Sequence, residues 1–161
     1  MKFQNVSFHE NKILFGRDST PCITAVEFDG NSDMEIFSRK EGKITSRREV
    51  FKPFIFLQGT EFLNKFPYPY EAKKLKGNAH YQYLIFLNNW ADLQRLIKYL
   101  KKTTGATSTS FNTPYYYLND PALQHLLITG LTLFKGMSFH DLVRLQLDIE
   151  TYCEEGYDFS N

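Results

Sequence analysis

Along the first third of the chain, hydrophobic positions come in short runs rich in β-branched and aromatic residues, a pattern typical of β-strands. Turns are predicted where glycine interrupts the pattern, at Asp29-Gly30 and at Glu41-Gly42. A further strand is predicted at residues 81–87, after a short helix at residues 60–66 and a polar connection rich in lysine. The strands expected in the first third are residues 13–15, 22–28, 34–37 and 51–57.

One segment has the period of an amphipathic helix. In residues 91–103 apolar side chains recur at i, i+3, i+4 and i+7, which places them on one face of a helix. Asn89 is the predicted N-cap and Gly105 the C-terminal stop. We expect this apolar face to pack on a sheet. Its members are Leu93, Leu96, Ile97 and Leu100.

A second helix is predicted to begin after Asp120, because a capping aspartate is followed by Pro121 at the first helical position. Gly130 is its predicted end. We expect this helix to bury its leucines, namely Leu123, Leu126 and Leu127.

Near the end of the chain, apolar residues alternate with polar ones from Val143 to Leu147, which predicts a strand. Residues two apart point to the same face of a strand, so Asp148 and Glu150 are expected to converge on one divalent cation. Hard cations such as Mg²⁺ prefer carboxylate oxygens, and nucleases use them to activate water. The alternative is that both acids merely face solvent at a strand end.

The composition narrows the class of protein. Of 161 residues, 42% are hydrophobic and 23% charged, which excludes a disordered tail, a collagen-like fibre and a disulfide miniprotein. The apolar runs are far shorter than the ~18–20 residues of a membrane span, so no membrane is expected. Cys22 and Cys153 form no zinc or redox motif, and no signal peptide is visible, so a reduced, cytoplasmic protein is expected.

Aromatic content and charge each have two interpretations, of which one is a nucleic-acid partner. The chain has 15 Phe, 10 Tyr and 1 Trp. Most of these rings are expected in the core, and the alternative is a surface on which bases stack. All 19 Lys and Arg precede Asp148, which leaves the first 147 residues with a net charge of +6. The basic stretch from Arg39 to Lys52 suits phosphates, although basic residues also protect the edges of sheets.

The runs at residues 121–131 and 142–151 together resemble the entry into the 3′–5′ exonuclease domain of family B DNA polymerases. In that family a helix of the form R-Y-L-x-x-x-G-L precedes a strand that ends in D-I-E-T, and this chain has Asp148-Ile149-Glu150-Thr151. Residues 51–56 (F-K-P-F-I-F) likewise resemble the family's F-x-P-Y-F-Y strand. The strand and helix at residues 81–100 match its next unit, so residues 45–161 are covered.

The resemblance implies an α+β fold. Residues 1–135 are expected to form the N-terminal domain of the polymerase, a mixed sheet with two or three packed helices related to RNA-binding, ferredoxin-like folds. Residues 136–161 are expected to begin an RNase H-like exonuclease domain with its first strand. Asp148 and Glu150 match its metal ligands and catalytic carboxylates, which hold Mg²⁺ or Mn²⁺ in the intact enzyme. The remaining aspartates do not follow before Asn161, so we expect an N-terminal fragment of a longer polymerase.

The resemblance also implies DNA as partner, namely the single-stranded template and the 3′ end of the primer, together with the rest of the polymerase chain. In a prokaryote this implies association with the nucleoid. Archaeal members detect uracil in this domain; Pro53 and Phe54 match that pocket, whereas Gln82 and Gln124 depart from the family pattern. The residues expected to contact nucleic acid are Arg47, Arg48, Lys52, Pro53, Phe54 and Tyr116.

Three functional hypotheses follow. In the first, the chain contributes template contacts and half of a proofreading site to a DNA-directed DNA polymerase, and is inactive alone because two carboxylates hold Mg²⁺ weakly. In the second, it is a free-standing module that binds single-stranded nucleic acid without catalysis. In the third, it is a scaffold in which Asp148 and Glu150 are incidental.

Overall fold

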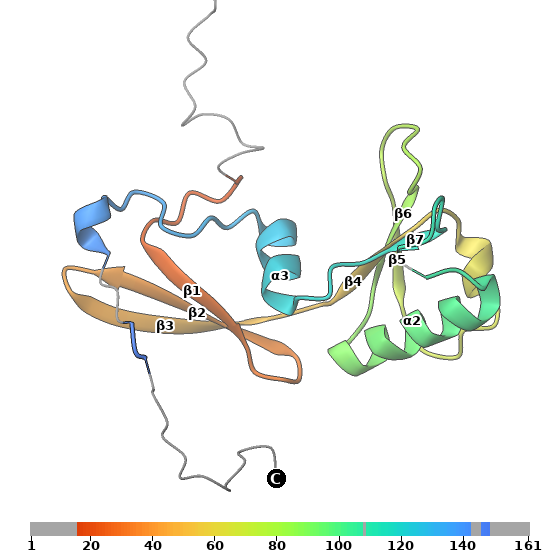
Figure 1. Ribbon diagram of the computed structural model, residues 1–161, viewed down its shortest axis with the longest axis horizontal. Helices are drawn as coiled ribbons and strands as arrows, with labels where there is room; N and C mark the ends of the chain where they lie inside the picture. The colour runs from red at the N-terminus through yellow and green to blue at the C-terminus, as the bar shows by residue number, and fades with distance from the viewer. Residues whose placement is uncertain (1–15, 108, 143–145, 149–161) are drawn as a thin grey trace, which may run out of the picture.

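The computed structural model describes residues 16–107, 109–142 and 146–148. These residues form an α+β fold with two separate sheets and two α-helices, and Figure 1 shows one sheet toward each end of the molecule. The predicted α+β class is therefore confirmed. The prediction of one mixed sheet is wrong, because every strand pair in both sheets is antiparallel.

The first sheet is a meander in which β1 (Ile23–Phe28), β2 (Asp33–Lys40) and β3 (Lys43–Val50) lie in the order β1-β2-β3. Asp29 closes the first turn, since its Oδ1 accepts from the backbone N–H groups of Asn31, Ser32 and Asp33. The second turn is two residues long, and both Glu41 (φ 51°) and Gly42 (φ 78°) adopt the left-handed conformation that such hairpins require. The sequence predicted both turns correctly but missed β3.

The second sheet has the order β5-β6-β4-β7, and its strands are β4 (Phe54–Leu57), β5 (Glu71–Lys74), β6 (Tyr83–Phe86) and β7 (Tyr115–Tyr116). A 3-10 helix, η2 (Thr60–Leu63), follows β4 where the short helix was predicted. The predicted strand at residues 51–57 is shorter than expected, because Pro53 has no N–H to donate and residues 51–53 connect the two sheets. The predicted polar connection is wrong at residues 71–74, which form β5.

Helix α2 (Trp90–Thr104) covers one face of the second sheet. The predicted caps are confirmed: Asn89 accepts from the N–H of Asp92, and Gly105 ends the helix at φ 69°. Its side chains Leu93, Leu96 and Leu100 are fully buried against Ile55, Leu57, Ile85, Leu87 and Tyr115. This cluster is the larger core of the molecule.

Helix α3 (Pro121–Thr129) begins and ends at the predicted residues but buries the wrong face for the prediction. Gln124 and His125 are buried, whereas Leu123 and Leu127 are 52% and 53% exposed. The reason is a pair of hydrogen bonds. The Gln124 Oε1 accepts from Phe54 N at 2.8 Å, and its Nε2 donates to Leu118 O at 2.8 Å, which turns the polar side of α3 toward β4.

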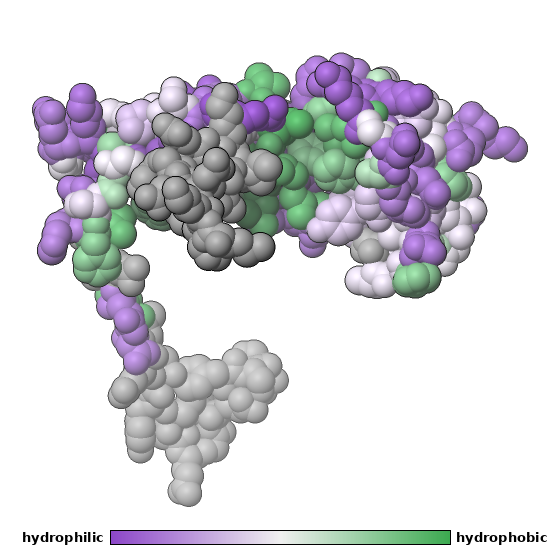
Figure 2. All heavy atoms as spheres, turned by 90° about the horizontal axis from the view of Figure 1, so that it is seen from above, coloured by the Kyte–Doolittle hydropathy of each residue, from purple (hydrophilic) through white to green (hydrophobic). Residues whose placement is uncertain are grey.

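As a result, leucines line an open surface groove of about 800 Å³ beside α3, here called the leucine groove. Figure 2 shows hydrophobic side chains gathered near the middle of the molecule, between hydrophilic surfaces at the two ends. The backbones of Gly16 and Gly130 meet here, since a Cβ on Gly16 would lie 2.1 Å from Gly130 O. The leucines of the groove are Leu118, Leu123, Leu126, Leu127, Leu131 and Leu133.

Aromatic rings join the two sheets. Phe28 at the end of β1 lies 5.7 Å from Phe51 and 6.0 Å from Trp90, the first residue of α2. The ring of His125 packs edge-on against Phe51 at 6.2 Å. Side chains from β1, α2, α3 and the connection between the sheets therefore meet in one aromatic junction.

After α3 the chain returns to the first sheet, where Phe134 N donates to Ile23 O and Leu131 packs against Ile23 and Ile36. The 3-10 helix η3 (Phe139–Asp141) follows. The predicted boundary at residue 135 stays a prediction. Residues 13–15 and 143–145 of the predicted strands lie outside the described residues, and residues 146–148 are not part of a strand. None of the described helices is long and apolar enough to cross a membrane.

Candidate nucleic-acid interface

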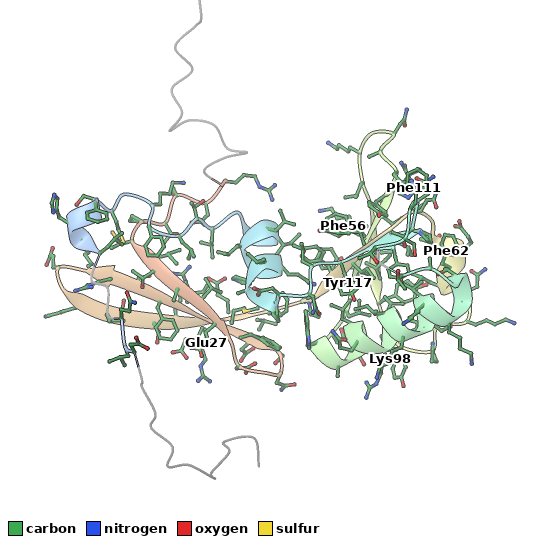
Figure 3. All side chains as sticks on the ribbon, viewed as in Figure 1. Glu27, Phe56, Phe62, Lys98, Phe111 and Tyr117 are labelled. Carbon is green, nitrogen blue, oxygen red and sulfur yellow. The ribbon has the colours of Figure 1, made fainter. Side chains whose placement is uncertain are left out.

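The second sheet has two faces of different character, because aromatic and aliphatic residues alternate along β4. Ile55 and Leu57 point toward α2 and belong to the core. Phe54 and Phe56 point to the opposite face, as strand geometry requires. In Figure 3, Phe56 lies on the side of the sheet away from α2, whereas Lys98 extends from the outer side of that helix. Within the described residues, α3 reaches this second face at its Phe54 end.

Three rings form a cluster on this face, which we call the aromatic platform: Phe56, Tyr81 and Tyr116. Phe56 lies 6.3 Å from each of the two tyrosines. The rings of Tyr81 and Tyr116 are 6.2 Å apart and nearly parallel, at 27°. Tyr116 is 41% exposed, and the other two rings are half-buried. The platform therefore presents partly exposed π-faces held in place by neighbouring rings.

The platform carries no negative charge near neutral pH. Burial raises the pKa of the Tyr81 hydroxyl above its ordinary value of 10.0, and the nearby Tyr116 raises it further. Tyr81 therefore keeps its proton, and the platform does not repel phosphate.

Positive charge lies on the β5 side of the same face. Strand register places Lys73 beside Leu84, which pairs with Phe56, which in turn pairs with Tyr116. These four residues form one row across the sheet, with a lysine at one end and a tyrosine at the other. Lys74 and Lys76 follow at the same edge. No described carboxylate forms an ion pair with any of these three exposed lysines.

Two residues predicted to contact nucleic acid are in the core instead. Pro53 is buried, and Phe54 is only 1% exposed. The Phe54 ring packs against Phe56 and Phe86 at 5.6 and 6.0 Å, so no base can stack on it. Stacking on Phe54 would require an exposed ring, so the predicted contact of Phe54 with nucleic acid stays a prediction. Tyr116, in contrast, is exposed on the platform.

The predicted basic residues lie elsewhere. Arg47 and Arg48 belong to β3 of the first sheet, and Lys52 lies in the connection between the sheets. Each has an acidic neighbour. Arg47 Nε is 2.9 Å from Glu49 Oε1, Arg48 pairs across the strands with Glu35, and Lys52 Nζ is 3.8 Å from Glu71 Oε2. Their role as phosphate contacts stays a prediction, and the structure does not bring them to the platform.

The predicted metal ligands are not assembled in the described residues. Asp148 is exposed and lies in no regular element, and Glu150 lies outside the described residues. No group of three or more His, Cys, Asp or Glu side chains that would hold a metal ion occurs in the part of the chain that the structure describes. The role of Asp148 and Glu150 as ligands of Mg²⁺ or Mn²⁺ therefore stays a prediction.

Sequence reasoning missed Phe56, Tyr81 and Lys73. The signal was present in Phe54-Ile55-Phe56-Leu57, where rings and aliphatic residues alternate with period two. Alternation shows that the two faces differ, but not which face the helix covers.

Comparisons with protein-family models, with curated proteins and with solved structures find no match to this chain. The fold and the site define it as an α+β protein with an aromatic sheet face bordered by lysines.

Proposed function

We propose that this chain binds single-stranded nucleic acid on the aromatic platform. The observation that carries the proposal is the partly exposed stack of Tyr81 and Tyr116 on the sheet face away from α2. Unpaired bases stack on such rings, with about 1–3 kcal/mol lost per ring that is replaced by alanine. Lys73 at the β5 edge supplies charge for the phosphates on the platform face, so base and backbone contacts lie on one surface.

The interface suits single strands better than duplexes. Stacking on a side chain requires a base whose face is free, and in a duplex that face is covered by the next base pair. An open sheet with aromatic residues is also the surface that RNA-recognition folds use for unpaired bases. The first sheet has no comparable cluster of rings among the described residues of its exposed face.

The test compares two tyrosines of equal exposure. Tyr116 on the platform and Tyr70 before β5 are each 41% exposed. We expect Tyr116→Ala to weaken binding to a fluorescent single-stranded oligonucleotide by about 5- to 150-fold in anisotropy titrations. The matched variant Tyr70→Ala should bind within about twofold of the wild type.

Salt dependence gives an independent measurement. In Lys73→Gln, which removes one phosphate contact, the slope of log affinity against log salt should become less negative by about 0.7. Absence of single-strand binding by the wild-type chain, or equal losses in the two tyrosine variants, would falsify the proposal.

We further propose that the chain serves as the template-contacting N-terminal part of a family B DNA polymerase. Support comes from the resemblance at residues 51–56 and 142–151, and from helices α2 and α3 following β6 in the expected order. A ferredoxin-like relationship and the metal role of Asp148 and Glu150 belong to this proposal. The chain alone should show no template-dependent synthesis and no degradation of a 3′ end. Degradation of a 3′ end by the wild-type chain that is lost in Asp148→Ala would contradict the predicted inactivity of the fragment.

A further inference from the structure

Phe111 is the most exposed large hydrophobic side chain in the described part of the protein, at 95%. A phenylalanine ring gains stability by burial, so an almost fully exposed one contributes nearly nothing to the fold. A single exposed hydrophobic side chain is common on protein surfaces, so its exposure alone does not mark a contact site. The question is therefore whether the loop that carries Phe111 is built to display it.

Hydrogen bonds on both sides of Phe111 hold its loop in shape. The Thr107 N–H donates to Ser110 Oγ at 3.0 Å, and Ser110 N donates back to Thr107 O at 3.0 Å. Thr113 N donates to Ser110 O at 3.3 Å, which closes a turn around Phe111 and Asn112. Asn112 adopts φ 53°, a conformation that asparagine tolerates better than most residues. The loop thus presents the ring from a defined backbone.

The same loop is tied to the aromatic platform. His80 Nε2 lies 3.0 Å from Thr113 O, and the His80 ring packs edge-on against Tyr81 at 4.8 Å. Phe111 is two residues from Thr113, so their Cα atoms lie within about 7 Å. Figure 3 shows Phe111 near the strands of the second sheet, on the side away from α2. The backbone that carries Phe111 is therefore joined through Thr113 and His80 to the Tyr81 end of the platform.

We propose that Phe111 is an additional stacking position, which takes an unpaired base of the same single strand beyond the one on Tyr81 and Tyr116. This inference rests on the proposed function and deepens it by assigning a longer binding path. Single-strand binding proteins place successive bases on separate rings along a charged groove. Phe111 has the exposure that such a position needs, whereas Phe54 and Tyr115 are each 1% exposed and offer no face.

Oligonucleotide length provides the test. With an oligonucleotide of about 12 nucleotides, we expect Phe111→Ala to bind about 5- to 150-fold more weakly than the wild type. With one of about 4 nucleotides, which the platform alone can hold, wild type and variant should agree within about twofold. Phe111→Trp, which keeps a ring, should bind the longer oligonucleotide like the wild type. Phe111→Leu should bind like Phe111→Ala.

Phe139 supplies the control, since it is 73% exposed in η3 beside the first sheet. Phe139→Ala should not change binding at either length. Phe111→Ala and Phe139→Ala should both unfold at about the same temperature as the wild type. Wild-type affinity in Phe111→Ala, beside a weakened Tyr116→Ala, overturns this inference and leaves the proposed function intact. Wild-type affinity in Phe111→Leu also overturns it, because hydrophobicity alone would then suffice. If the wild type binds neither oligonucleotide, the proposed function itself is wrong.

Discussion

Helices α2 and α3 are built alike at their ends and differently along their sides. Each begins at a side chain that accepts hydrogen bonds from the first turn: Asn89 from Asp92 N, and Asp120 from Ala122 N and Leu123 N. Each ends at a glycine in the left-handed conformation. Yet α2 buries leucines, and α3 buries Gln124 and His125 while two of its leucines are exposed.

The difference comes from what each helix meets. Helix α2 lies across a complete apolar sheet face, so its stripe of leucines is buried in the usual way. Helix α3 lies where the chain passes from one sheet to the other, and there β4 offers an unpaired backbone N–H at Phe54. Gln124 satisfies that buried donor, which would cost about 1–3 kcal/mol if it were left unpaired. A cap is thus a local property of a helix, whereas the buried face depends on its neighbours.

The two helices differ most in how much their leucines should contribute to the free energy of unfolding. Replacing the fully buried Leu96 of α2 by alanine should lower the free energy of unfolding by about 2–5 kcal/mol, because it leaves a cavity in the larger core. Leu127→Ala in α3 should change it by no more than about 0.5 kcal/mol, since that side chain is 53% exposed. Urea denaturation measures both. Equal losses would show that the leucine groove is covered in solution.

The amide of Gln124 is the second point at which the helices differ. Gln124→Ala removes the acceptor for Phe54 N and the donor to Leu118 O, so we expect a loss of about 1–3 kcal/mol. In α2, Gln94 is half-buried and provides the matched control. Gln94→Ala should stay within about 0.5 kcal/mol of the wild type in the same denaturation experiment. A Gln124→Ala variant as stable as Gln94→Ala would show that the two hydrogen bonds of Gln124 do not stabilise the buried face of α3.

The sequence predicts the ends of both helices because capping needs only a few adjacent residues. Asn89, Gly105, Asp120 and Gly130 each act within one turn, and their roles can be read without knowing the fold. The turns at Asp29 and Gly42 were predictable for the same reason. The leucines of α3 were misjudged because periodicity identifies a leucine-rich face but not the buried donor at Phe54 that attracts Gln124.

Edge strands and the candidate site were harder to predict. In β3 seven of the eight residues are exposed, and all four of β5 are, so neither strand shows a hydrophobic face in the sequence. Their membership of a sheet depends on pairing with β2 and β6. The platform combines β4, β7 and Tyr81 just before β6, and only the register brings Phe56 beside Tyr116. Phe54 was chosen from a family motif, and the structure shows that its neighbour two residues on has the partly exposed ring.

The smallest effect on stability is expected for His125, the buried histidine of α3, because its surroundings shift its pKa in opposite directions. Burial lowers the pKa of His125, the adjacent Glu49 raises it, and Arg47 lowers it again, with a net lowering. The folded state therefore prefers neutral imidazole, while the unfolded chain binds a proton near its ordinary pKa of about 6.5. Stability is fully present above that value and falls as the pH drops below it toward the folded pKa.

We expect the urea midpoint of the wild type to decrease from about pH 7 to about pH 5. Part of that decrease should disappear in His125→Phe, which cannot titrate and keeps a ring against Phe51. His140 in η3 is exposed, so His140→Phe should retain the full wild-type decrease. If the stability of His125→Phe and His140→Phe had the same pH dependence, protonation of His125 would not be coupled to folding. On the buried face of α3, Gln124 alone would then contribute to stability through its polar groups.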